Sequence, residues 1–124
     1  MTMNKQYAKV KRLKKRADGL FQEVGLLLQP CCAICGQKAV VRHHFIAKSL
    51  SSGLRHEIKN GVSLCYSHHS RWHQTGDPEL YEKMVSSMTV EQQEFLKKDR
   101  RREIKPTQEN YQRAIDELTK LNNL

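Results

Sequence analysis

The sequence has no long apolar run and no internal repeat. None of its apolar stretches approaches the roughly twenty residues that a membrane-spanning helix needs. The basic N-terminal segment is not followed by the apolar core of a secretory signal peptide. Low-complexity segments are also missing. These absences argue against membrane and secreted proteins, so a cytoplasmic protein with no membrane partner is expected.

Acidic residues are scarce, with 13 Asp and Glu against 22 Lys and Arg and a formal net charge of +9. The first sixteen residues contain many basic side chains and no acid. Such an excess points to a polyanionic partner, DNA or RNA, because each phosphate that is neutralised releases counterions. A solvated helix face is the alternative interpretation of this N-terminal arm. The candidate DNA contacts are Lys9, Lys11, Arg12, Lys14, Lys15 and Arg16 in the arm, and Arg42, Arg55, Lys59 and Arg71 further along.

The four cysteines are unevenly placed, which suits metal binding in a reducing compartment better than disulfides. Cys32-x2-Cys35 is followed about thirty residues later by Cys65-x2-His68. Two such pairs are what a closed tetrahedral zinc site needs. Cys31 could replace Cys32 as a ligand, but Cys-x2-Cys is the usual geometry, so Cys31 is expected to be a spare buried thiol. Because a core of about forty residues buries too little surface to be stable alone, a structural metal is expected.

All six histidines lie between residues 43 and 73. His43 and His44 fall in an alternating segment, 39–46, that predicts a strand, so their side chains should point to opposite sides. His69 and His73 are four residues apart on a predicted helix and should share one face. Together with His43 they would supply three imidazoles and leave positions open, which is the arrangement of a catalytic metal site.

The His43-His44 doublet, Asn60 and His69-x3-His73, threaded through the cysteine and histidine pairs, resemble the HNH endonuclease family. These enzymes are zinc-framed relatives of the ββα-metal nucleases, and the resemblance covers residues 32–73. The family more often has Cys where this chain has His68. Small basic proteins of this kind are similar to nucleases encoded by phages and mobile elements, including ones that act in recombination. A phage-encoded protein would work in the host cytoplasm.

The resemblance implies a role for each residue of the motif. His44 would be the general base that activates water, and Asn60 would brace the loop that orients His44, besides forming a turn with Gly61. The implied reaction is hydrolysis of DNA phosphodiester bonds to 5′-phosphate and 3′-hydroxyl ends. A structural Zn²⁺ would be held by Cys32, Cys35, Cys65 and His68, and one catalytic divalent metal (Mg²⁺, Mn²⁺, Ni²⁺ or Zn²⁺) by His43, His69 and His73. His56 has no place in the motif and is expected at the surface.

The expected fold is α+β, with a small treble-clef ββα-metal core, a β-hairpin plus helix around a structural zinc, flanked by N- and C-terminal helices. Apolar residues spaced three or four apart predict one or two helical pieces up to residue 28. Helix starts are predicted at Asp77-Pro78, Thr89 and Thr107. The expected parts are a basic helical extension (1–30), the HNH core (31–76) and C-terminal helices packed on the core (77–124).

Two other functions fit parts of the sequence. A non-catalytic zinc-dependent nucleic-acid-binding module explains the zinc pairs and the charge, but it leaves His43, His44 and His73 without a role. A helical adaptor that binds protein through its C-terminal stripe accounts for residues 77–124 only. A homodimer, or a recombination or replication protein as partner, also fits, because one site of this type cuts one strand.

Overall fold

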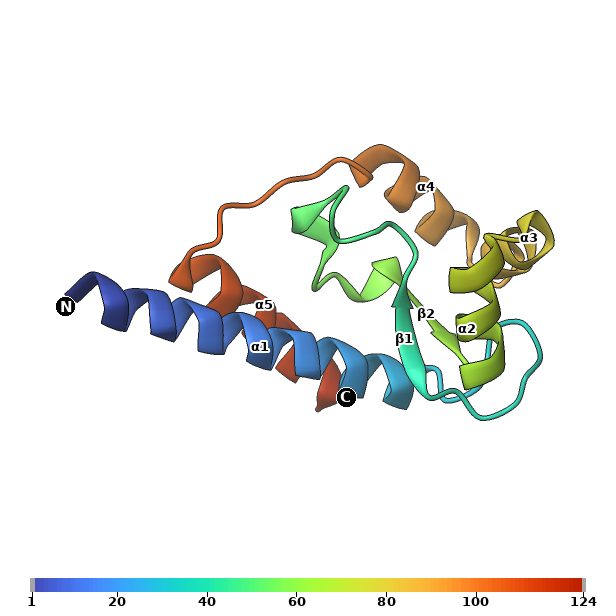
Figure 1. Ribbon diagram of the computed structural model, residues 1–124, viewed down its shortest axis with the longest axis horizontal. Coiled ribbons are helices and arrows are strands. Elements are labelled where there is room, and N and C mark those ends of the chain that lie inside the picture. The colour runs from blue at the N-terminus through green and yellow to red at the C-terminus, as the bar shows by residue number, and fades with distance from the viewer. Residues whose placement is uncertain (1, 124) are drawn as a thin grey trace.

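The structure is a computed structural model that describes residues 2–123 (Figure 1). Within this range the chain has an α+β fold with five α-helices and one two-stranded antiparallel sheet, as predicted at the level of fold class. None of the helices in the described range is both long enough and apolar enough to cross a membrane. The elements are α1 (Thr2–Leu28), β1 (Val41–His44), η1 (Ser52–Leu54), η2 (Ile58–Asn60), β2 (Gly61–Leu64), α2 (Tyr66–Thr75), α3 (Pro78–Ser86), α4 (Val90–Asp99) and α5 (Gln108–Asn122).

The helix α1 is continuous over 27 residues, because its apolar side chains form one stripe that α5 covers. Figure 1 shows α5 lying along α1, away from the sheet. The buried residues of this pair are Ala17, Leu20, Phe21, Val24, Ile115 and Leu118. The helix α5 thus packs mainly on α1, with Ile58 of the predicted core region beside their shared cluster.

The second apolar cluster surrounds the sheet and holds α3 and α4 against it. In the sheet, β1 and β2 pair so that His43 lies opposite Val62 and His44 opposite Gly61. The buried members of the cluster are Cys32, Leu54, Val62, Leu64, Cys65, Met84, Met88 and Leu96. The core thus places the histidine doublet at the end of a buried strand.

The predicted helix starts are confirmed. Asp77 caps α3 with Pro78 in its first turn. The Thr89 side chain accepts a hydrogen bond from the backbone N–H of Gln92, and Thr107 caps α5 in the same way. These caps mark where each of the three C-terminal helices begins.

The helix α2 is unusual because none of its residues 66–75, all described, is fully buried. It is ten residues long, and isolated helices of that length are marginal in water. Its ends are capped, by the Cys65 sulfur at the N-terminus and by Gly76 with φ 59° at the C-terminus. Partly buried Trp72 packs against the core cluster, and His68 lies beside the sulfurs of Cys32 and Cys65, so these side chains hold α2 in place.

Candidate metal centres

Cys32, Cys35, Cys65 and His68 form the first centre, with all four ligand atoms within 4.8 Å of one another. Cys35 Sγ lies 3.9 Å from Cys65 Sγ, and His68 Nδ1 lies 3.3 Å and 3.8 Å from the sulfurs of Cys65 and Cys32. A tetrahedral zinc site with Zn–S distances of about 2.3 Å has ligand separations of about 3.7 Å. The group therefore has the size and the donor atoms to hold a metal such as zinc.

The first cysteine pair is presented by a tight turn. Gly36 has φ 76°, a left-handed conformation that favours glycine, and its N–H donates to the Cys32 carbonyl at 2.9 Å. The cluster includes Cys32 and not Cys31. Cys31 is exposed, which corrects the expectation of a spare buried thiol.

The electrostatic environment of Cys32 favours its thiolate. Burial raises the pKa of this thiol, but hydrogen bonds from backbone N–H groups, among them Ile34, outweigh burial and lower the pKa to about 6. Thiolates rather than thiols bind metals. At neutral pH Cys32 is thus ready to bind a soft cation. At Cys35 a backbone hydrogen bond at Gln37 lowers the pKa, but burial and the neighbouring thiols of Cys32 and Cys65 outweigh it and raise the pKa.

The second centre joins His43 of β1 to His69 and His73 of α2, with ligand nitrogens again within 4.8 Å of one another. The Nε2 atoms of His69 and His73 are 2.9 Å apart, and the His43 ring centroid lies 5.4 Å and 5.6 Å from theirs. His43 is buried and His73 is exposed, so one side of the cluster faces solvent. Such a set can bind a divalent transition metal and leave positions open.

Two imidazoles of this centre, those of His43 and His69, favour the neutral form that metal ligands need. Burial, followed by the charges of His69 and His73, lowers the pKa of His43 to about 4. Burial and the neighbouring His73 also lower the pKa of His69. The cluster therefore does not have to lose protons before a cation binds through these two residues.

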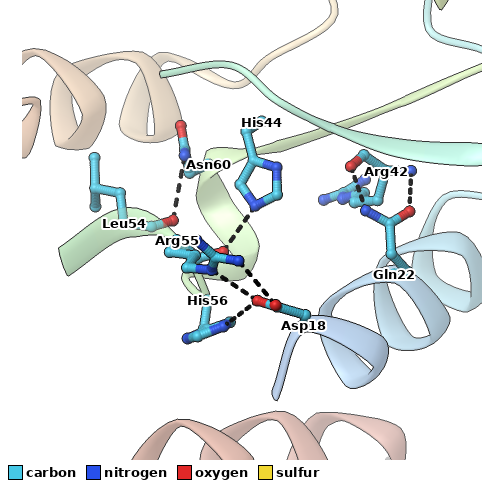
Figure 2. A network of polar contacts seen from close by, with 8 residues as sticks. All are labelled: Asp18, Gln22, Arg42, His44, Leu54, Arg55, His56 and Asn60. Atoms are coloured by element: carbon cyan, nitrogen blue, oxygen red, sulfur yellow. Dashed lines mark hydrogen bonds and ion pairs between the residues drawn. The ribbon is translucent and has the colours of Figure 1, made fainter. Parts of the chain in front are cut away.

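His44 does not join the cluster but is fixed by a separate contact. Its Nε2 lies 2.8 Å from the backbone carbonyl oxygen of Arg55 (Figure 2). Because a carbonyl only accepts, Nε2 carries the proton and Nδ1 keeps its lone pair. Burial lowers the pKa of His44, partly offset by that hydrogen bond. A neutral imidazole with a free nitrogen is a suitable general base.

Asn60 is fully buried and braces the loop between the strands. Its Oδ1 accepts from the N–H of Ile46 at 2.8 Å. Its Nδ2 donates to the carbonyls of Ile46 and Leu54 at 3.0 Å and 3.2 Å. Figure 2 shows Asn60 beside Leu54, the residue just before the carbonyl that holds His44. Asn60 thus joins the exit of β1 to the turn at residue 54 without touching His44 itself.

The basic residues predicted to contact DNA fall into two groups. Those of the N-terminal arm, Lys9 to Arg16, lie on α1, exposed except for a half-buried Lys14, and within residues 2–123 none of them forms an ion pair. Lys59 lies over the ring of Phe95, with Nζ 4.6 Å from its centroid, and Arg71 pairs with Asp77 at 3.0 Å. Among these predicted contacts, all within residues 2–123, only those of the arm form a row of unpaired positive charges.

Arg42 contradicts the prediction of a phosphate contact, because it is 4 % exposed. Its guanidinium donates to Gln29, to Ser63 Oγ at 3.0 Å and to the carbonyl of Ile58 at 3.0 Å. Its stem passes so close to Gly25 and Gly61 that a Cβ atom at either position would clash with it. Arg42 is therefore a buried packing residue.

Arg55 and His56 are also engaged inside the protein. Arg55 makes two hydrogen bonds of 2.8 Å to the carboxylate of Asp18. His56 is buried rather than exposed as predicted, and its Nε2 donates to the same carboxylate at 2.6 Å. Asp18 went unnoticed in the sequence, although it is the first acid after the basic arm.

A cleft of about 750 Å³ adjoins the second centre. His43, His44 and His73 contribute to its lining, together with apolar side chains that include Phe45 and Tyr81. Its lining also includes Lys97, Arg100 and Arg101, which are exposed and come from the end of α4 and the two residues after it. Nothing local in the sequence links this basic run to the histidines, so only the fold brings it to the cleft.

Comparisons with protein-family models, with curated proteins and with solved structures gave no match. The functional assignment therefore rests on the geometry of these residues.

Proposed function

We propose that this protein is a metal-dependent endonuclease of the HNH type that hydrolyses phosphodiester bonds of DNA to 5′-phosphate and 3′-hydroxyl ends. The observation that carries the proposal concerns His44. This residue lines the same cleft as His43 and His73, and its Nδ1 is free to accept a proton. A structural zinc finger has no need for a second histidine cluster or for a neutral imidazole held in one tautomer beside it.

Two metals with different tasks fit the two clusters. The thiolate-rich group of Cys32, Cys35, Cys65 and His68 supports a zinc-framed treble-clef core, because all its positions are filled by protein. The group of His43, His69 and His73 supports a catalytic metal, because it has only three ligands and one exposed side. Three imidazoles favour the later transition metals over Mg²⁺, which prefers oxygen ligands.

The chain's own residues then divide the work. His44 accepts a proton from the attacking water at Nδ1, and the Arg55 carbonyl retains the proton on Nε2 and keeps the ring oriented. Lys97, Arg100 and Arg101 bind phosphates near the cleft. His43, His69 and His73 would hold a divalent ion, which would neutralise charge on the phosphate and assist the departing oxygen.

Binding to DNA is expected to be largely independent of sequence. The basic face of α1 presents exposed lysines and arginines, which contact phosphates rather than bases. With the cleft rim, they give the protein two separate positive surfaces. This arrangement orients a strand on the enzyme but does not select a base.

The proposal is tested by nicking of supercoiled plasmid with Mg²⁺, Mn²⁺, Ni²⁺ or Zn²⁺ in turn, comparing the wild type with His44→Ala. The wild type should cut with at least one metal, and the variant should be about 100-fold slower or worse, because general-base catalysis contributes that much. DNA affinity and bound zinc are measured for both proteins, to show that the variant is folded.

Two other outcomes are informative. If neither protein cuts any form of DNA while both bind it with a steep salt dependence, the protein is a non-catalytic binding module. If His44→Ala cuts as fast as the wild type, the nuclease stands but His44 is not its base.

A further inference from the structure

The carbonyl that holds His44 belongs to a residue whose side chain is clamped by α1. Arg55 presents its backbone oxygen to His44 Nε2 at 2.8 Å, while its guanidinium makes two hydrogen bonds of 2.8 Å to Asp18. Figure 2 shows the chain of contacts running from α1 through Arg55 to the His44 ring. One residue thus links the N-terminal helix to the proposed base, across 37 positions of sequence between Asp18 and Arg55.

The turn that carries this carbonyl is weakly held by its own backbone. The N–H groups of Leu54 and Arg55 reach the carbonyls of Ser51 and Ser52 only at 3.4 Å each, which is long for a hydrogen bond. Asn60 stabilises the Leu54 carbonyl, one residue before, at 3.2 Å. The N–H of Gly53 and the hydroxyl of Ser51 also tie the start of the turn to the Arg102 carbonyl, at 3.0 Å and 2.6 Å. The clamp on the Arg55 side chain adds to these contacts, and it acts on the residue that carries the carbonyl.

The Asp18 carboxylate is well suited to act as that clamp. It receives three donors, two from Arg55 and one from His56 Nε2 at 2.6 Å. His56 is itself buried and packs edge-on against Tyr111 of α5, with ring centroids 5.8 Å apart. Burial raises the pKa of Asp18, but the hydrogen bonds from Arg55 and His56 outweigh it and hold the pKa well below its usual range. Asp18 is therefore ionised throughout the physiological range.

The helix α1 also contacts His44 directly. Phe21, one turn after Asp18 on α1, stacks on the His44 ring with centroids 4.4 Å apart and planes 14° apart. Phe21 is 1 % exposed and belongs to the buried stripe of α1, so its own position is firmly set. The face of the His44 ring and its Nε2 edge are thus both positioned from α1.

We propose that Asp18 is a positioning residue for His44, acting through Arg55 to hold the carbonyl that keeps the His44 ring in its Nε2–H tautomer with Nδ1 free. The consequence for catalysis rests on the proposed function, whereas the positioning itself does not. On this proposal α1 is part of the catalytic apparatus as well as a basic arm. An ion pair that merely ties α1 to the core would have no effect on the His44 ring.

The direct test is the His44 ring proton, followed by NMR of zinc-loaded protein labelled with ¹⁵N-histidine. The wild type should show a protonated Nε2 on His44, and Asp18→Asn should speed exchange of that proton by about tenfold or more. Glu23→Gln is the matched control, because Glu23 is an exposed acid on α1 and its replacement changes the charge equally. Unchanged exchange in folded Asp18→Asn overturns the proposal. If Asp18→Asn does not fold, Arg55→Lys replaces it, since lysine keeps the charge but cannot make both hydrogen bonds.

The catalytic consequence is measured by single-turnover cleavage with the same variants. Asp18→Asn should lower the cleavage rate by about ten- to a hundredfold with unchanged DNA affinity, because misplacing a catalytic group slows the chemical step. In a His44→Ala background the same replacement should have no further effect. A wild type that cuts nothing refutes the proposed function, while ring-proton exchange still decides the positioning. Equal rates for Asp18→Asn and Glu23→Gln in a wild type that cuts refute the positioning alone.

Discussion

Replacing Cys32 by alanine should greatly weaken binding of the proposed structural metal, whereas replacing its neighbour Cys31 should not. The two cysteines are adjacent in the sequence, yet only Cys32 belongs to the four-ligand cluster. Cys32 is 3 % exposed and lies in the core of the sheet, while Cys31 is exposed. The pair therefore offers two chemically identical replacements with opposite expected outcomes.

The size of the effect follows from the site. Structural zinc contributes on the order of 10–16 kcal/mol in zinc-finger peptides, so one of four ligands accounts for about 3–4 kcal/mol. The small void left by Cys32→Ala adds about 1 kcal/mol. A total near 4 kcal/mol is a large part of the 5–15 kcal/mol typical of a domain and lowers the melting temperature by about 15 °C. Cys31→Ala should change stability by less than about 0.5 kcal/mol.

The assay is zinc content after dialysis against a moderate chelator, together with thermal unfolding followed by circular dichroism. In Cys32→Ala the helix α2 should also lose order, because none of its residues 66–75 is fully buried and the proposed metal ligands at its start reinforce the packing of Trp72 on the core. The helices α1 and α5 should persist, since their shared apolar stripe is separate from the metal ligands. Loss of zinc from Cys31→Ala with retention in Cys32→Ala would refute the ligand assignment.

Three further predictions concern the second centre and the surface. Asn60→Ala should lower the free energy of unfolding by about 3 kcal/mol, because it leaves the buried backbone groups of Ile46 and Leu54 without partners. Denaturant titration of the zinc-loaded protein measures this free energy, and a loss under about 1 kcal/mol would contradict the prediction. Burial lowers the pKa of His44, so the neutral form that accepts a proton persists below pH 6.5, and a bound cation shifts the pKa in the same direction. Single-turnover cleavage should therefore hold its rate from pH 7.5 down to about pH 6.5, and an acid limb at or above neutrality would argue against His44 as the base. Replacing Lys11 and Lys15 on the exposed face of α1 should reduce the slope of log affinity against log salt by up to about two. The control Lys83→Ala removes a cation already paired with Glu79 and should leave this slope unchanged. Equal slopes for all variants would show that the arm does not contact DNA.

The two sets of candidate metal ligands could be predicted from the sequence, because the residues of each pair lie close together in the chain. A Cys-x2-Cys turn brings two sulfurs together, and residues four apart on a helix share a face, whatever the rest of the chain does. The alternation around Val41 likewise predicted the strand that carries the histidine doublet, and the capping residues predicted where the later helices begin. In each case the physical cause acts within a few residues.

The contact partners of the charged residues could not be predicted from the sequence, because these partners lie in segments far apart in the chain. Arg42 looks like any basic residue until the structure places its stem between Gly25 and Gly61. The packing of α5 mainly on α1 could not be predicted either, because it depends on which apolar helix faces contact each other in the folded protein.

By itself, then, the sequence determined the two ligand clusters and the α+β class, since spacing and periodicity are properties of short segments. Only the tertiary structure decided that Arg42 is buried and that Asp18 reaches Arg55 across 37 positions. The physical reason is that burial and ion pairing depend on distances in space, which the order of residues along the chain does not record.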